Sequence, residues 1–85
     1  MASYRLSFKS SVARDLRSIP NQDVVKILAR IEALAGNPRP PGCEKLSGLP
    51  RYRVRQGVYR IVYEIQDDVL LVLVVKIGHR KDVYR

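Results

Sequence analysis

Apolar residues recur at every second position in two parts of this chain, which is the period of a β-strand. Near the start, Tyr4, Leu6 and Phe8 alternate with polar residues. From 58 to 65, the alternating apolar residues are Tyr59, Ile61, Tyr63 and Ile65. Both patterns predict strands with one buried face. The apolar run from Val69 to Ile77, ended by Gly78, predicts an interior strand covered on much of both faces.

Between the first strand and the later ones, the apolar positions change to helical spacing. A short helix is predicted to carry Val12, Leu16 and Ile19, with Ser10 or Ser11 able to cap it. Pro20 ends this helix or opens the next one. The longer helix has apolar residues at Val24, Ile27, Leu28, Ile31, Leu34 and Ala35. Gly36 is a natural C-cap, and Asn37-Pro38 prevents continuation.

The remaining segments are connections. The stretch from Gly36 to Pro50 contains four prolines and three glycines and predicts a loop. Gln56-Gly57 and Asp67-Asp68 predict tight turns, which force antiparallel pairing. Residues 1–85 are therefore expected to form one α+β domain in the order strand, helix, helix and three strands. Its antiparallel sheet has the two N-terminal helices packed on one face.

The predicted hairpin at 51–60, RYRVRQGVYR, collects four arginines and no acid. With Gln56-Gly57 as the loop, Arg53 faces Arg60. Arg53, Arg55 and Arg60 then share one face of the sheet, and Tyr52, Val54, Tyr59, Ile61 and Tyr63 share the other. Like charges opposite one another weaken a sheet, so their presence favours an anion-binding role. Glu64, four residues after Arg60, is expected to be the charge partner of Arg60 rather than a general base.

The net charge sharpens this expectation. Sixteen Lys and Arg stand against eight Asp and Glu, a net charge of +8, and half of the cations lie in 51–60 and 76–85. Focused positive charge favours a polyphosphate partner through counterion release. An anionic membrane surface is the competing interpretation, but it normally uses a basic amphipathic helix. A solvated basic surface is the third.

Other chemistries have little support in the sequence. Cys43 is the one cysteine, which rules out a disulfide framework and a cysteine-based metal site. The first residues lack the apolar region of a signal peptide, and no apolar run is long enough to span a bilayer. The sequence therefore predicts a soluble, cytoplasmic protein without a metal or another cofactor.

The segment Gly78-His79-Arg80 follows the interior strand and lies where loops commonly present functional groups. His79 is either a general acid or base or an ordinary structural residue. Tyr84 is able to stack on a base, bind a phosphate or pack on the sheet. RNA cleavage by its own 2′-OH needs a base, an acid and cations around the transition state. The sequence supplies the cations in abundance.

Three segments resemble the RelE/ParE superfamily of toxins, and the resemblance covers essentially the whole chain. They are KLSGLPRYR, YRVRQGVYRIVYEI and VVKIGHRKDVYR. The last two are most similar to the RelE branch. This resemblance implies the toxin of a type II toxin–antitoxin system that cleaves mRNA in the ribosomal A site. In that branch, 2′-OH attack leaves a 2′,3′-cyclic phosphate and a 5′ hydroxyl.

The resemblance also implies roles for individual residues. The catalytic set is Arg60 and Arg80 as phosphate clamps, His79 as acid or base, and Tyr84 as the residue that orients or activates the nucleophile. The RNA-binding set is Arg51, Arg53, Arg55 and Lys81. Arg53 and Arg55 stand where the family's prototype has lysines. Because arginine keeps its proton near neutral pH, proton transfer is left to His79 or Tyr84, or is only weakly catalysed.

The partners implied are a cognate RelB-like antitoxin in a hetero-oligomer, the ribosome and mRNA, with no membrane. Two alternatives stay open. A ParE-like toxin would poison DNA gyrase by protein contact and would not need clustered arginines. A non-catalytic RNA- or ribosome-binding module is favoured by the absence of a lysine base.

Overall fold

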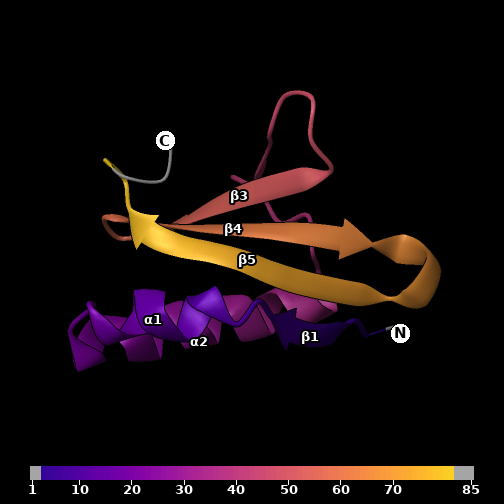
Figure 1. The fold of residues 1–85 in the computed structure, drawn as a ribbon. Coiled ribbons are helices and arrows are strands. Elements are labelled where there is room, and N and C mark those ends of the chain that lie inside the picture. The colour runs from indigo at the N-terminus through magenta and orange to yellow at the C-terminus, as the bar shows by residue number, and fades with distance from the viewer. Residues whose placement is uncertain (1–2, 82–85) are drawn as a thin grey trace.

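The computed structural model describes residues 3–81, which form two helices against one face of a five-stranded sheet (Figure 1). The helices are α1 (Ser11–Arg17) and α2 (Asn21–Gly36). The strands are β1 (Arg5–Phe8), β2 (Glu44–Lys45), β3 (Arg51–Gln56), β4 (Tyr59–Gln66) and β5 (Leu71–His79). The predicted α+β class is confirmed, and so is the predicted order of a strand, two helices and then the three longer strands. The two-residue β2 is an addition, because it lies inside the stretch predicted to be a loop.

The strands lie side by side in the order β1-β5-β4-β3-β2. Neighbours from β5 to β2 are antiparallel, as the tight connections require. The first strand is parallel to the last, with Arg5 opposite Leu71 and Phe8 opposite Val74. Helices α1 and α2 connect β1 to the rest of the sheet, and they cover the lower face of the sheet in the view of Figure 1.

The helix ends differ in part from the prediction. Ser10 precedes α1 but its side chain makes no capping bond, because its backbone is already helical (φ −57°, ψ −30°) rather than extended. Pro20, in extended conformation, opens α2. Gly36 is the last helical residue, and Asn37 is the C-cap. None of the helices in residues 3–81 is long and apolar enough to cross a membrane.

The β3–β4 turn lies one residue later than predicted. The loop is Gly57-Val58, and Gly57 has a φ of +62°. Two-residue hairpin loops need positive φ at their first position, where glycine pays no steric cost. The predicted pairing was therefore wrong: Arg55 faces Arg60, and Arg53 faces Val62.

The β4–β5 connection is also longer than predicted. A 3₁₀ turn at Asp67–Val69 is followed by Leu70 in the left-handed region, with a φ of +52°. The last strand therefore begins at Leu71 rather than Val69, and it continues past Gly78 to His79.

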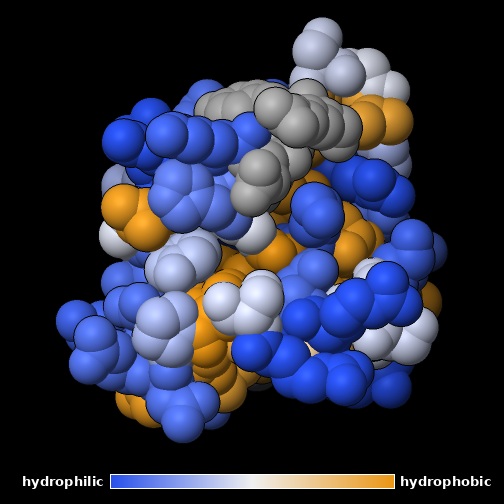
Figure 2. Space-filling model, turned by 60° about the vertical axis from the view of Figure 1, so that its left-hand side comes forward, coloured by the Kyte–Doolittle hydropathy of each residue, from blue (hydrophilic) through white to orange (hydrophobic). Residues whose placement is uncertain are grey.

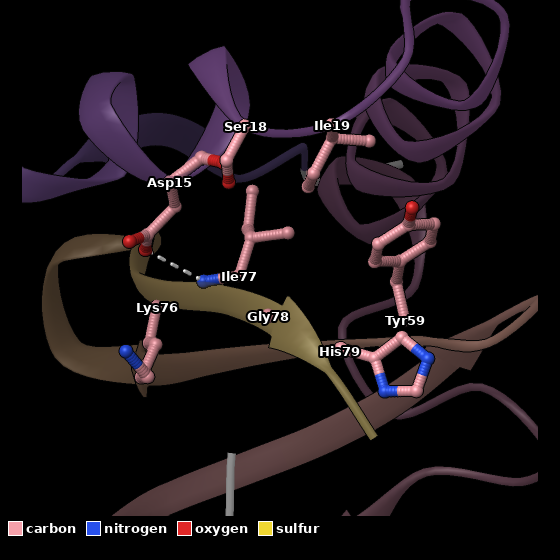
Figure 3. Close-up of a pocket in the computed structure, with 8 residues that line it drawn as sticks. All are labelled: Asp15, Ser18, Ile19, Tyr59, Lys76, Ile77, Gly78 and His79. Atoms are coloured by element: carbon pink, nitrogen blue, oxygen red, sulfur yellow. Dashed lines mark hydrogen bonds between the residues drawn. The ribbon is translucent and has the colours of Figure 1, made fainter. Parts of the chain in front are cut away.

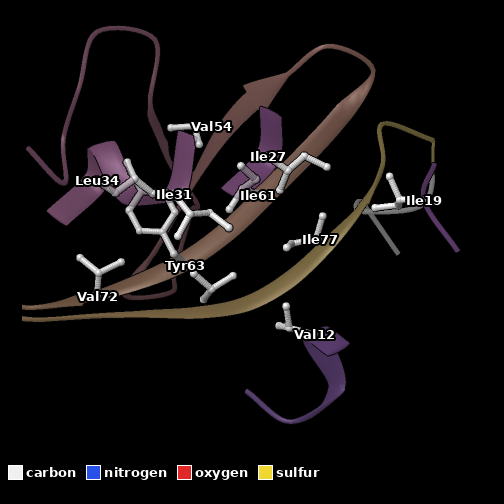
Figure 4. Packing of buried hydrophobic residues seen from close by; sticks show 11 residues of the cluster. Val12, Ile19, Ile27, Ile31, Leu34, Val54, Ile61, Tyr63, Val72 and Ile77 are labelled. Carbon is white, nitrogen blue, oxygen red and sulfur yellow. The ribbon is translucent and has the colours of Figure 1, made fainter. Parts of the chain in front are cut away.

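The hydrophobic core lies between the helices and the sheet (Figure 4). The helical layer contributes Val12, Ile19, Ile27, Ile31 and Leu34, and the sheet contributes Val54, Ile61, Tyr63, Val72, Val74 and Ile77. Tyr63 is fully buried, and its hydroxyl donates to the carbonyl of Pro38 at 2.6 Å. Burial raises the pKa of Tyr63. This bond fixes the start of the proline-rich loop to the centre of the sheet.

A second cluster holds the same loop at the β4–β5 turn. The guanidinium of Arg39 donates to both oxygens of Asp67, at 2.9 and 3.3 Å, and to the hydroxyl of Tyr52 at 3.3 Å. The hydroxyl of Tyr4 donates to the same carboxylate at 2.6 Å. Arg39 first, and then Tyr4, lowers the pKa of Asp67 below its ordinary value. These contacts are largely exposed, so they contribute little to the stability of the fold. Their main effect is to hold the loop in one position beside the β4–β5 turn.

Candidate nucleic-acid interface

One face of the sheet, opposite the helices, carries the predicted arginines. The strand register places six residues of β3 and β4 on it, which we call the arginine face: Arg51, Arg53, Arg55, Arg60, Val62 and Glu64. Lys76 and Gly78 of β5 lie opposite Val62 and Arg60, so they extend this face. Tyr52, Val54, Tyr59, Ile61 and Tyr63 lie on the helix side. The predicted division of the hairpin into two faces is confirmed.

Two of the arginines are joined to acids. Nε of Arg51 donates to Glu64 at 3.1 Å, and Nη2 of Arg53 donates to Glu44 of β2 at 3.0 Å. The prediction that Glu64 pairs with Arg60 was therefore wrong. Four residues along a strand separate Cα atoms by about 13 Å. Arg51, by contrast, lies directly across the ladder from Glu64.

The positive charge is concentrated toward the β3–β4 turn. Arg55 is exposed and directly opposite Arg60, whose side chain is buried at 6% exposure. Gly78 flanks Arg60 on β5, so that strand contributes no side chain there. Two cations facing each other across a ladder weaken the pairing, while a phosphate between or beside them would remove the repulsion.

The end of β5 brings Arg80 to the same end of the sheet. The backbone N–H of Arg80 donates to the carbonyl of Val58 in the β3–β4 turn at 2.8 Å. Arg80 and Lys81 are both exposed. The structure thus brings Arg55, Arg60 and Arg80 to one end of the molecule, whereas Arg51 lies toward the other end of β3. Tyr84 lies outside the described residues.

His79 takes a different direction. It is paired with Tyr59, which lies on the helix side, and the two rings meet edge to face with centroids 6.1 Å apart. The histidine lines a cavity of about 320 Å³ together with Asp15, Ser18 and Lys76 (Figure 3). Its Nδ1 accepts a hydrogen bond from the backbone N–H of Lys81 at 3.3 Å. By register, the structure does not bring this side chain onto the arginine face.

Asp15 is a structural residue that the sequence did not indicate. Strand β1 ends opposite Val74, so among residues 3–81 β5 has no strand partner on that side beyond this point. There, Oδ2 of Asp15 on α1 accepts the backbone N–H of Ile77 at 3.0 Å (Figure 3). A single acid on a short helix usually points to solvent, so no pattern distinguishes it.

The surface around this end of the molecule is mainly polar. Figure 2 shows hydrophilic residues over most of it, with hydrophobic residues visible between them. Among residues 3–81, no three His, Cys, Asp or Glu side chains lie close enough together to hold a metal ion.

Known toxins are similar to this chain over nearly its whole length. Residues 6–84 match the model of a family described as the ParE toxin of type II toxin–antitoxin systems, parDE. Toxin RelG of Mycobacterium tuberculosis is 28% identical, over 96% of this chain and 97% of its own length. The putative toxin RelE1 of Methanocaldococcus jannaschii is 29% identical, over 96% of each chain.

A solved structure with the same fold is the archaeal RelE–RelB complex from Pyrococcus horikoshii. It matches with a TM-score of 0.83 and 26% identity, over 94% of this chain and 98% of that one. The family match spans nearly the whole chain, and the sequence relatives and the structure agree with it. The chain belongs to the ParE toxin family of type II toxin–antitoxin systems, within the RelE/ParE superfamily.

Proposed function

We propose that this toxin is a ribosome-dependent endoribonuclease that cleaves mRNA in the A site by attack of the 2′-OH. The observation that carries the proposal is the facing pair of Arg55 and Arg60, with Arg80 at the same end of the sheet. The similarity to RelG and RelE1 supports it.

The proposed reaction needs little covalent chemistry from the protein. The 2′-OH loses its proton to a base and attacks the neighbouring phosphorus. The 5′ oxygen then leaves with a proton from an acid, so that a cyclic phosphate and a 5′ hydroxyl remain. Arg60 and Arg80 bind the phosphate as negative charge builds on it, while Arg51, Arg53, Arg55 and Lys81 hold the RNA backbone.

We assign the proton transfers to a residue other than these arginines, because guanidinium does not lose its proton near neutral pH. The candidates from the sequence are His79 and Tyr84. We also propose that the reaction runs without a metal ion, because the RNA supplies its own nucleophile.

An antitoxin is the proposed partner in the cytoplasm. The P. horikoshii toxin was solved with its RelB. We infer that a cognate antitoxin binds this chain in a hetero-oligomer and supplies acidic groups to the arginine face. Glu44 and Glu64 form ion pairs with Arg53 and Arg51. The turn end of the face gathers Arg55, Arg60 and Arg80, so we expect a polyanion to bind there.

Primer extension on mRNA recovered from translating ribosomes tests the proposal. The expected result is cleavage in the A site with 2′,3′-cyclic ends. Arg60→Ala and Arg80→Ala should each slow it about 10²- to 10³-fold, the typical cost of one transition-state donor. Arg17→Ala, which removes an exposed cation from α1, is the matched control and should leave the rate unchanged. Uncut mRNA in the presence of folded protein would refute the proposal and would favour a non-catalytic ribosome-binding module.

A gyrase poison is the second candidate, because the matching family model is that of ParE. Its specific prediction is inhibition of DNA supercoiling by purified gyrase, with no dependence on Arg60. A supercoiling assay run with the same variants separates the two activities.

A further inference from the structure

We propose that His79 is a positioning residue that fixes the backbone around Arg80, and not the general acid or base of the cleavage. This inference rests on the proposed function for its catalytic consequence, but its geometric basis is independent of it. The basis is the Nδ1 contact to Lys81 and the helix-side direction of the ring.

The two peptide groups that flank Arg80 are both held. On one side, the N–H of Arg80 donates to the carbonyl of Val58 at 2.8 Å. On the other, the N–H of Lys81 donates to Nδ1 of His79 at 3.3 Å. Fixing both amides restricts the φ and ψ of the arginine between them. The imidazole therefore sets the direction in which Arg80 leaves the sheet, at the end where Arg55 and Arg60 face each other.

This contact also limits what the ring is able to do chemically. A side chain that accepts the N–H two residues ahead imitates a backbone turn, in the manner of Asn and Asp in Asx turns. With Nδ1 as the acceptor, the neutral ring carries its proton on Nε2. A general base would need a lone pair directed at the 2′-OH, and the lone pair of Nδ1 is already engaged.

The ring also faces away from the cations that would bind the phosphate. Its edge-to-face contact is with Tyr59, a helix-side residue. The cavity that it lines is bounded by Asp15 and Ser18 from the helical layer, and Lys76 of the arginine face also lines it (Figure 3). Arg55 and Arg60 lie on the opposite face of the same strands. Proton transfer across the sheet would require the ring to leave both Tyr59 and Lys81.

Two substitutions at one position separate the roles. His79→Asn keeps an acceptor suited to the N–H two residues ahead but has no imidazole chemistry. His79→Leu keeps apolar contact with Tyr59 but has no acceptor. We expect Asn to retain ribosomal cleavage within about threefold, and Leu to lose about 10- to 100-fold, as a misdirected catalytic group does. If both variants lose about 10²- to 10⁴-fold, the histidine is an acid or base and the inference is wrong.

Hydrogen exchange of the Lys81 amide, measured by NMR on the free toxin, gives a readout that needs no activity. His79→Leu should speed exchange about 2- to 10-fold, the value of one neutral hydrogen bond, and His79→Asn should preserve the wild-type rate. Unchanged exchange in His79→Leu would overturn the inference. Should the wild type fail to cut mRNA, the proposed function fails, and this exchange result alone decides the role of His79.

Discussion

Gly57→Ala tests the hairpin that presents the arginines, since the turn depends on one backbone angle. Gly57 has a φ of +62°, and a Cβ added there would meet no atom of residues 3–81 within 4 Å. The cost is therefore conformational rather than steric with neighbours, about 1–2 kcal/mol for a left-handed alanine. Alanine also restricts the unfolded chain, which returns about 0.4–1 kcal/mol.

Gly36→Ala is the matched control, because this glycine ends α2 without positive φ and also has open space around its Cβ position. Gly36→Ala restricts the unfolded chain as much as Gly57→Ala does, but its alanine does not have to adopt a left-handed conformation. The difference in the free energy of unfolding between the two variants therefore measures the cost of that conformation. Urea denaturation should place Gly57→Ala about 1–2 kcal/mol below Gly36→Ala. In thermal melts this is about 4–16 °C for a domain of this size. Equal stability of the two variants would refute the assigned turn.

Three further changes test other parts of the fold. Asp15→Ala removes the acceptor of the Ile77 N–H and should lower the free energy of unfolding by about 1.5–3 kcal/mol in urea titrations; a loss below about 0.5 kcal/mol would contradict that role. Leu70→Asn relieves a φ of +52° and should raise the melting temperature, with a gain of about 0.5–1 kcal/mol; a lower melting temperature would contradict the strain. Because Arg39 lowers the pKa of Asp67 below 3.8, the stability that this carboxylate contributes is present above about pH 4 and is lost as the pH falls further. The difference between wild type and Asp67→Asn should therefore shrink in urea titrations below pH 4; a difference that grows would refute the pairing.

The two faces of the hairpin were predictable even though its pairing was not. Moving the loop from Gln56-Gly57 to Gly57-Val58 changes the partner of Arg53 from Arg60 to Val62. Both partners lie on the same side of β4, because residues two apart on a strand share a face. Periodicity therefore determines which side chains face the core. The register depends on the φ preference of one glycine.

Contacts between distant segments were beyond prediction from local pattern. Glu44 lies in a proline-rich stretch, and only the folding of that stretch along β3 brings it to Arg53. Asp15 bonds to β5 because α1 crosses the open edge of that strand. The side of the sheet that His79 faces was likewise not predictable, because it depends on β5 continuing past Gly78 to His79.

The pairing of β1 with β5 has a consequence for how the chain is made. A ribosome completes β1 first, yet its partner Leu71–Val74 is synthesised after both helices and the arginine hairpin. Until β5 arrives, the core lacks Val72, Val74 and Ile77, and β4 has an empty neighbouring position. Non-local pairing of this kind forms late, because the intervening chain must first be brought together. The native surface of this domain therefore forms only after β5 has been synthesised.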